Sequence, residues 1–269
     1  MDYGVRDVQE KELEILIQFD RVCKKLGLRY FLSSGTLLGA IRHKGFIPWD
    51  DDVDVMMPWK DYKKFLKYGQ SEMGDRFFVQ SNFSDLWYRE YTKVRMNGTT
   101  AIEESYKDIP FHQGIWIDIF PIIGVKNKEN WINRFNRYIQ FRNLFVQDLF
   151  FNRTENLSSF LKLLKKIPLS LRRGAIKFMD ILFMKDPTHS EYVSYLWGFG
   201  VNRCYNSKLF SEEVSVDFEG YDLPIPKEYD RLLTQIYGDY MTPPDEAHRG
   251  NTHSFYILDT KTDYTEYLK

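Results

Sequence analysis

The chain has 269 residues, enough for one large domain or two small ones that bury a core. Hydrophobic residues make up 43% and charged residues 28%, and this ordinary globular usage excludes a disordered chain. No apolar run reaches the roughly 18 to 20 residues that span a bilayer, which argues against an integral membrane protein. Lysine and arginine number 37 against 38 aspartate and glutamate, so the formal charge of −1 gives no general attraction to nucleic acid.

The two cysteines, Cys23 and Cys204, lack CxxC spacing and any accompanying Cys and His pattern. This excludes a structural zinc site and favours reduced thiols. Residues 1–7 lack the basic start and apolar core of a secretory signal, so we expect a cytoplasmic chain.

The first 125 residues are predicted to be mixed α/β. Apolar residues at helical spacing predict a helix over residues 5–26, which Gly27 ends. A short strand over 28–32, a turn of small residues over 33–36 and a short helix over 37–43 follow. Another helix over 59–68 begins after Pro58. Further strands are predicted at 53–56, 77–80, 86–96 and 114–119.

Residues 126–213 differ from this pattern, because aromatic and basic residues recur at helical spacing over 131–151 and 157–184. They predict a helical insertion or second lobe. Residues 155–185 include seven basic side chains and two acidic ones. This excess of positive charge indicates either a solvated helix face or a surface that binds an anionic membrane. The basic residues are Lys162, Lys165, Lys166, Arg172, Arg173, Lys177 and Lys185.

Residues 214–269 return to strand and turn signals and contain several prolines. We expect this segment to pack back on the first one. The chain is thus divided into a core over 1–125, a helical lobe over 126–213 and a C-terminal segment over 214–269.

Four aspartates fall within five positions, at Asp50, Asp51, Asp52 and Asp54. In a strand, residues two apart share a face, so Asp50, Asp52 and Asp54 would project together while the intervening valines face the core. Asp51 would point elsewhere. Converging carboxylates suit one or two Mg²⁺ or Mn²⁺ ions, whereas the alternative is an acidic surface loop. The valines at alternate positions favour the metal site.

A further acid, Asp118, stands alone inside the apolar strand predicted near 114–119. A buried carboxylate is costly, so Asp118 should have a metal, an arginine or a hydrogen-bonding partner. Three carboxylates on two neighbouring strands form the usual frame for metal-assisted phosphoryl or nucleotidyl transfer. Backbone N–H groups of a preceding small-residue turn would bind phosphate, and the turn consists of Ser33, Ser34, Gly35 and Thr36.

Residues 30–55 read YFLSSGTLLGAIRHKGFIPWDDDVDV, a stretch that closely resembles the signature of the LicD family. These are bacterial phosphocholine transferases related to the fukutin-type proteins. The resemblance resumes at residues 114–121, 218–220, 224–226 and 237–241, whereas residues 126–214 show no match. Fukutin-related members carry cysteines for a zinc site, and this chain has too few, so it resembles the compact bacterial type.

The resemblance implies an α/β (α+β) fold of the nucleotidyltransferase type, with a mixed sheet, flanking helices and the helical insertion or second lobe. It also implies that Asp52 and Asp54 hold Mg²⁺ or Mn²⁺ and that Asp118 is the third carboxylate. Relatives often have a second glycine or a serine where this chain has Thr36, so its phosphate contact can differ.

The reaction that the resemblance implies starts from CDP-choline. An acceptor hydroxyl attacks the choline-side phosphorus in line, CMP leaves, and Asp118 either holds the metal or accepts the proton. The acceptor would be a glycan or a lipid-linked glycan precursor of the teichoic acid, lipopolysaccharide or capsule type. The basic helices of the middle region would contact the anionic membrane that presents it.

Several basic residues are candidates for substrate binding. Arg42 and His43 either reach phosphate or form a basic loop that balances the acids. On the predicted strand period, Tyr91, Lys93 and Arg95 share a face that suits phosphate and a stacked base, or they lie on an exposed strand edge. In the C-terminal segment, Arg249 and His253 belong either to the pocket or to the surface.

Aromatic residues contribute either to the core or to a cage for the quaternary ammonium of choline. The candidates are Trp49, Trp87, Tyr88 and Trp116. Three alternative functions stay open: transfer of ribitol or glycerol phosphate from a CDP donor, nucleotidyl transfer from an NTP, and a non-catalytic membrane-associated scaffold. Intact acids argue against the scaffold.

Overall fold

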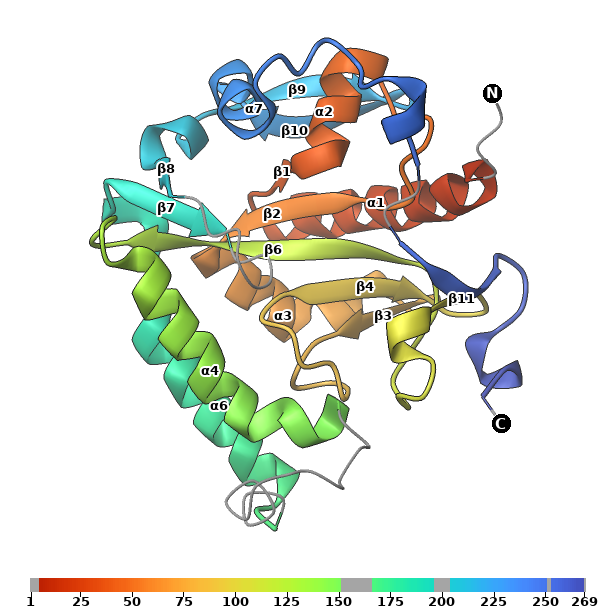
Figure 1. Ribbon diagram of the computed structural model, residues 1–269, viewed down its shortest axis with the longest axis vertical. Helices are drawn as coiled ribbons and strands as arrows, with labels where there is room; N and C mark the ends of the chain where they lie inside the picture. The colour runs from red at the N-terminus through yellow and green to blue at the C-terminus, as the bar shows by residue number, and fades with distance from the viewer. Residues whose placement is uncertain (1–4, 151–165, 196–203, 251–252, 269) are drawn as a thin grey trace.

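The computed structural model describes residues 5–150, 166–195, 204–250 and 253–268. Its main sheet has seven strands, five of which lie in the order β1-β2-β6-β4-β3, with β7 paired to β6 and β8 paired to β7 (Figure 1). Their bounds are β1 (Phe31–Leu32), β2 (Asp54–Pro58), β3 (Phe77–Gln80), β4 (Thr92–Met96), β6 (Trp116–Val125), β7 (Tyr192–Tyr195) and β8 (Tyr205–Asn206). The α/β class is confirmed.

Strand β6 is the centre of the sheet, and all ten of its residues are buried. It pairs in parallel with β2 and antiparallel with β4 and β7. Its nearly continuous apolar sequence is typical of a strand covered on both faces, and this setting isolates Asp118 from water.

Helices α1 (Arg6–Leu26) and α3 (Trp59–Met73) pack against the sheet, behind it in Figure 1. The predicted first helix is confirmed, and Gly27 ends it with a φ of 62°. Helix α3 continues past the predicted residue 68 and ends before Gly74. Helix α2 (Ser34–His43) begins three residues earlier than predicted, so the small residues form its first turn.

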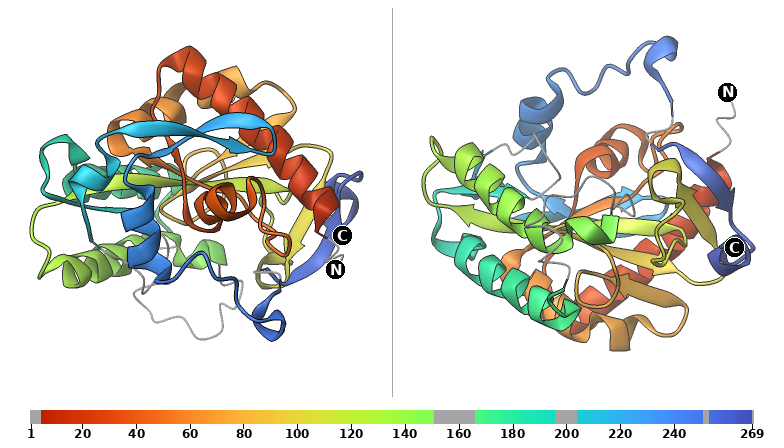
Figure 2. Two further views of the ribbon diagram at one scale, coloured as in Figure 1. Left: turned by 90° about the horizontal axis from the view of Figure 1, so that it is seen from above. Right: turned by 60° about the horizontal axis from the view of Figure 1, so that its bottom comes forward.

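The C-terminal segment contacts the chain in two places. The hairpin of β9 (Glu213–Phe218) and β10 (Tyr221–Pro226) lies against β1 and α2, and α7 (Tyr229–Tyr237) follows it. Strand β11 (Phe255–Asp259) pairs with β5 (Thr100–Glu103), so the segment crosses from one end of the molecule to the other (Figure 2). Short 3-10 helices are η1 (Glu104–Tyr106), η3 (Pro187–His189), η4 (Ser207–Phe210), η5 (Glu246–His248) and η6 (Tyr264–Glu266).

Helices α4 (Trp131–Phe150) and α6 (Leu169–Phe183) lie side by side in Figures 1 and 2, and Tyr138 stacks on Phe183 at 4.1 Å between ring centroids. The predicted helix over 131–151 is confirmed through residue 150. Of the helix predicted over 157–184, the part up to residue 165, with Lys162 and Lys165, lies outside the described residues. No helix in the described parts of the chain is long and apolar enough to cross a membrane.

Four strand predictions were wrong in extent, and α7 was not predicted. The strand predicted over 53–56 covers residues 54–58. The first strand covers residues 31–32 instead of 28–32, and the central strand runs to residue 125. The strand predicted over 86–96 begins at Thr92, because residues 86–91 form a loop around the buried Trp87. The Trp87 indole donates a hydrogen bond to the Tyr91 carbonyl at 2.8 Å, so the apolar residues there serve a small second core.

Candidate active site

The sheet aligns two of the predicted acids. Asp54, the first residue of β2, is the parallel partner of Asp118 on β6, and Asp118 is the antiparallel partner of Lys93 on β4. Directly paired residues project from the same face of a sheet, so the three side chains form a row. The Lys93 ammonium lies 2.8 Å from Asp118 Oδ1 and donates to Oδ2 at 3.1 Å. The partner that the burial of Asp118 requires is therefore a lysine.

A cleft of about 420 Å³ brings five predicted site residues together. Its walls include Ser34, Gly35, Asp50, Asp52 and Asp54, and we call it the acidic cleft. Asp50, Asp52 and Asp54 line one cleft, as the two-residue period predicted, although only Asp54 lies within a strand. Asp51 was predicted to point elsewhere, yet one of its carboxylate oxygens also lies near those of Asp50 and Asp52.

The first turn of α2 forms one wall of the acidic cleft. Ser34 has a φ of 48°, and a Cβ on Gly35 would lie 2.6 Å from Asp50 Oδ2, so a side chain there would displace that carboxylate. Thr36 lies behind the wall, where its Oγ1 accepts the Asp54 N–H at 2.8 Å. The N-cap residue Ser33 makes no side-chain cap, and uncapped N–H groups at a helix start suit an anionic ligand.

Burial and like charge act together on the carboxylates of the cleft. Burial raises the pKa of Asp52 well above its usual value, and Asp50 raises it further. Burial likewise raises the pKa of Asp54, assisted by Asp52 and Asp118 and opposed by Lys93. A bound cation would relieve this repulsion. Its ligands would be hard oxygens, because one carboxylate oxygen each from Asp50, Asp51 and Asp52 lies within 4.8 Å of the others.

Sequence reasoning missed a further acid behind the cleft. Glu12 of α1 is 2% exposed, and its Oε2 has no hydrogen-bond partner among the described residues. Burial raises its pKa well above the usual value, and the charge of Asp52 adds to this shift. Its position was a detectable signal, because it interrupts the apolar stripe of Val8, Ile15 and Phe19. The residues present therefore fit a divalent metal better than they fit an empty acidic pocket.

The remaining aspartate of the run anchors the loop. Asp51 is buried and points to the C-terminal segment, where its carboxylate accepts the His253 N–H at 3.2 Å and lies 3.3 Å from His253 Nδ1. Burial by itself would lower the pKa of His253, but Asp51 and Asp52 raise it to about 9. Gln9 holds the other side by donating to the Asp50 carbonyl at 2.9 Å. His253 is therefore brought to the site through Asp51.

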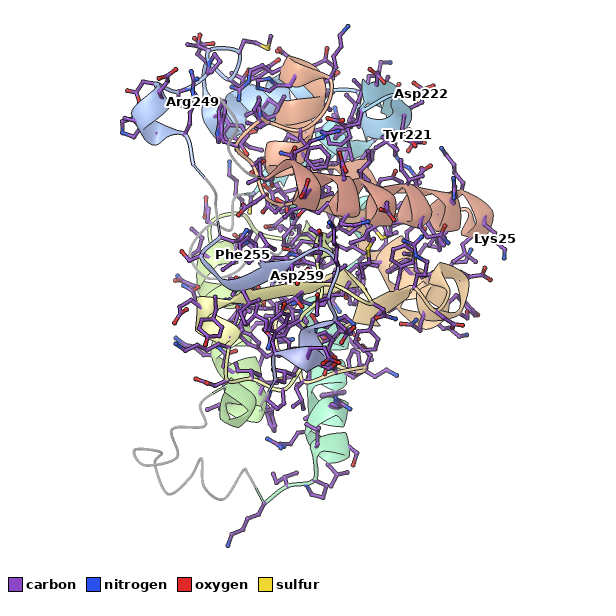
Figure 3. All side chains as sticks on the ribbon, turned by 90° about the vertical axis from the view of Figure 1, so that its right-hand side faces the viewer. Lys25, Tyr221, Asp222, Arg249, Phe255 and Asp259 are labelled. Atoms are coloured by element: carbon purple, nitrogen blue, oxygen red, sulfur yellow. The ribbon has the colours of Figure 1, made fainter. Side chains whose placement is uncertain are left out.

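Three basic candidates gather around Trp49, which lines the acidic cleft. The Arg249 guanidinium lies 4.9 Å from the Trp49 ring centroid, and the His43 ring is edge-on to Trp49 at 6.2 Å. Arg42 donates to the Tyr240 carbonyl at 2.8 Å, and burial lowers its pKa, with the charge of Arg249 adding to the effect. Figure 3 shows Arg249 in the upper part of the molecule, together with Tyr221 and Asp222 of the β9–β10 hairpin, and Asp259 below it.

The two basic residues of β4 have other neighbours. Lys93 and Arg95 are 2% and 1% exposed, so the exposed-edge alternative for this strand is wrong. Arg95 donates to Gln80 Oε1 at 2.6 Å and to the Gly114 carbonyl at 2.7 Å. The Lys93 ammonium and the Arg95 guanidinium both lie over the Trp116 ring. Arg95 is held by contacts within the protein, and neither residue is part of the described lining of the cleft.

Aromatic side chains line the other side of the acidic cleft. They come from β7, β8 and α7, namely Tyr195, Tyr205 and Tyr237, and the first two stack at 5.7 Å with an interplanar angle of 10°. Of the four predicted aromatic faces, Trp49 lines the cleft, while Trp87 and Trp116 surround Lys93 and Tyr88 packs on Trp87. Sequence reasoning missed the tyrosines because they are far apart in the chain.

Comparison with known proteins identifies relatives of this chain. A sequence profile described as LicD/FKTN/FKRP, nucleotidyltransferase domain, matches residues 27–158, which include every acid of the cleft and extend further than the motifs indicated. The lipopolysaccharide cholinephosphotransferase LicD of Haemophilus influenzae is 30% identical over 275 residues, covering 94% of this chain and 98% of that protein.

More distant relatives share one half of the chain. The ribitol 5-phosphate transferase FKRP of Mus musculus is 28% identical over 128 residues, which are 48% of this chain and 24% of that protein. Mannosyltransferase regulator 4 of Saccharomyces cerevisiae is 27% identical over 125 residues, or 44% of this chain and 10% of that protein. Because the Haemophilus relative is matched over nearly its whole length, the chain belongs to the LicD/FKTN/FKRP family and is a phosphotransferase.

Proposed function

We propose that this enzyme transfers phosphocholine from CDP-choline to a hydroxyl group of a cell-surface glycan precursor and releases CMP. The observation that carries the proposal is the composition of the acidic cleft, where three aspartates and the start of α2 face three tyrosines. Acids with a bound cation suit a diphosphate, and aromatic faces suit a quaternary ammonium group. The name of the Haemophilus relative supports the same chemistry.

Asp52 and Asp54 would hold Mg²⁺ or Mn²⁺, with Asp50 beside them, and Asp118 would complete the set of carboxylates. When bound, the cation neutralises the charge that develops on the diphosphate and on departing CMP. The N–H groups at the start of α2 would bind a phosphate oxygen. Asp118 would either contact the metal or accept the proton of the attacking hydroxyl.

The cytidine end of the donor would lie near Trp49. Its ring offers a stacking face, and Arg249 and Arg42 supply positive charge nearby. Burial lowers the pKa of His43, with the charge of Arg42 adding to the effect, so His43 would contribute a neutral ring. The aromatic wall of Tyr195, Tyr205 and Tyr237 would then receive the choline end. This orientation places the diphosphate between the two ends, beside Asp52 and Asp54.

Ribitol or glycerol phosphate is the second candidate cargo, because tyrosine hydroxyl groups also bind polyols and the FKRP relatives are named ribitol 5-phosphate transferases. The acceptor would be a glycan or lipid-linked glycan of the lipopolysaccharide, teichoic acid or capsule type. We place the reaction on the cytoplasmic side of the membrane, where cytidine-activated donors are made.

The test is CMP release by the full chain from CDP-choline, CDP-ribitol or CDP-glycerol, with Mg²⁺ or Mn²⁺ and a cell-envelope glycan fraction. The variants are Asp52→Asn and Asp54→Asn, and the control is Asp217→Asn, an exposed acid on β9. We expect metal-dependent CMP from CDP-choline that both site variants abolish and the control retains. If CMP is released from CDP-ribitol or CDP-glycerol instead, the transferred group is a polyol phosphate and not phosphocholine. If the chain releases pyrophosphate from an NTP, the reaction is nucleotidyl transfer.

A further inference from the structure

The α4–α6 pair buries apolar side chains together with charged ones, and it also leaves several large apolar side chains exposed. Arg142 is buried and donates to the carbonyls of Tyr88 and Arg89, the latter at 2.7 Å. Asp180 is also buried and accepts the Tyr138 hydroxyl at 2.6 Å. Large apolar residues occupy the outer side, and their exposed fractions are 59% for Phe141, 64% for Leu171, 61% for Phe178, 59% for Ile181 and 56% for Leu182. We call these five residues the α4–α6 face.

Helical spacing and a shared groove connect four of the five residues of this face. On α6 the spacing of Leu171, Phe178 and Leu182 places them on one side of the helix. Phe141 of α4 and Leu182 line the same open groove between the two helices, with a volume of about 410 Å³. Single exposed hydrophobic side chains are ordinary on a protein surface, but a joined set of this kind indicates a surface that something covers.

The charges around the face are positive. Arg134 and Arg137 border the groove, and Lys177 and Lys185 are exposed on and just beyond α6. Among the side chains described for residues 131–146 of α4 and for α6, the one carboxylate is Asp180, which is buried, and the exposed Asp186 follows Lys185. An apolar surface bordered by basic groups complements a bilayer with anionic headgroups.

We propose that the α4–α6 face docks peripherally on an anionic membrane. Its apolar side chains would enter the boundary between headgroups and acyl chains, and Arg137, Lys177 and Lys185 would contact lipid phosphates. The helices would lie on the membrane and not cross it, in agreement with the absence of a spanning helix among the described residues.

Docking there would orient the acidic cleft. Helix α4 follows β6, which carries Asp118, and α6 precedes β7, which carries Tyr195. Both ends of the pair are thus attached to the sheet that forms the site, and Figures 1 and 2 show the pair at one edge of the molecule. A docked pair would hold the cleft at a constant height above the membrane, as a lipid-linked acceptor requires.

The test is flotation of the full chain with vesicles of phosphatidylcholine alone or mixed with phosphatidylglycerol. The apolar variant combines Leu171→Gln, Phe178→Gln and Leu182→Gln, and its control combines Tyr221→Gln, Met241→Gln and Tyr256→Gln, which are exposed elsewhere. The charge variant combines Arg137→Gln, Lys177→Gln and Lys185→Gln, and its control combines Arg21→Gln, Lys24→Gln and Lys25→Gln on α1. No donor or acceptor is present, so the result is independent of the proposed reaction.

We expect the native chain and both controls to float with the anionic vesicles at low salt and to be released at high salt. The apolar variant should partition about tenfold less, and the charge variant should lose the salt dependence. Each variant should keep its melting temperature, because the replaced side chains are exposed. Failure of the native chain to float, or equal losses in the controls, would overturn the proposal. If the native chain does not bind vesicles but forms a concentration-dependent dimer, and the apolar variant stays monomeric, the face binds a second copy of the chain.

Discussion

The acidic cleft and the α4–α6 pair differ in how their charged side chains are arranged. In the cleft, carboxylates from β2 and the preceding loop crowd together, and burial raises the pKa values of Asp52 and Asp54. In the helical pair, the buried Arg142 and Asp180 have hydrogen-bond partners within the protein, while the outer side exposes Phe178 and its apolar neighbours.

What each region lacks indicates what it binds. The described lining of the cleft has three carboxylates and no basic side chain, so a divalent cation suits it, and the bound cation in turn suits a phosphate ester. The helical pair lacks cover for its apolar side, so a membrane surface suits it. The clustered acids of the cleft and the exposed apolar side chains of the helical pair both lower the stability of the folded chain. Such unfavourable features are typical of functional sites.

The strongest test of this contrast replaces an acid of the cleft by its neutral amide. Asp54→Asn should lower CMP release about a thousandfold, because a metal ligand is lost. Without added metal it should also raise the free energy of unfolding by about 1 kcal/mol. The raised pKa of Asp54 means that its ionised form destabilises the fold near neutral pH, and the amide removes this cost.

Both readouts come from the same preparations, by CMP assay and by urea unfolding in chelator. Asp217→Asn on the exposed side of β9 should change neither quantity. An Asp54→Asn chain that loses stability along with activity would contradict the view that the cleft is destabilised for function.

The ion pair of Lys93 with Asp118 should be the opposite case. Lys93→Met leaves a buried carboxylate without its partner and should lower the free energy of unfolding by about 3 to 5 kcal/mol. Adding Asp118→Leu should restore part of that loss. Lys227→Met breaks an exposed ion pair of the same 2.8 Å length with Glu212 and should leave the free energy of unfolding nearly unchanged, because water screens this pair. Similar losses in the free energy of unfolding for Lys93→Met and Lys227→Met would show that Lys93 does not stabilise the buried Asp118 carboxylate.

Inside the helical pair, Tyr138→Phe removes the donor that faces the buried Asp180. We expect it to lower the free energy of unfolding by about 1 to 3 kcal/mol and to leave CMP release unchanged. Tyr267→Phe, which removes an exposed hydrogen bond to Asp259, is the matched control and should leave the free energy of unfolding nearly unchanged. Loss of CMP release in the Tyr138→Phe chain would show that the interior of the α4–α6 pair affects the acidic cleft, which contradicts our treatment of the two regions as independent.

At the aromatic wall, Tyr237→Leu should lower kcat/KM for CDP-choline about tenfold, because a ring face near the cationic group is lost. Tyr237→Phe keeps the ring and should stay near the native value. If the phenylalanine variant is impaired as much as the leucine variant, the hydroxyl group is what matters, and a polyol cargo becomes the better assignment.

His112 lies outside both regions and should give the smallest effect. Its Nδ1 accepts the Gly114 N–H at 3.2 Å, and burial lowers its pKa from about 6.5 to about 4. The fold therefore favours the neutral ring, and stability should fall as the pH drops from about 6.5 toward 4, by about 1 to 2 kcal/mol. His112→Gln should flatten that dependence in thermal unfolding at pH values near 7 and 5. A native chain as stable at the lower pH as at the higher would contradict this.

The sequence by itself determined the local parts of the site. The two-residue period of Asp50, Asp52 and Asp54 predicted their convergence, because alternation along an extended backbone is a local property. The helical spacing of α1 and its end at Gly27 are equally local. Resemblance over residues 30–55 indicated the family, which the match over nearly the whole Haemophilus relative confirmed.

Only the tertiary structure decided which distant residues meet. Strand pairing placed Lys93 against Asp118, and folding brought Tyr195, Tyr205 and Tyr237 to one wall and Glu12 behind the acids. Sheet order and the packing of separate helices are set by the whole chain, so no local pattern contains them. For the same reason, helical spacing predicted α4 but could not show that Phe141 and the large apolar residues of α6 remain exposed.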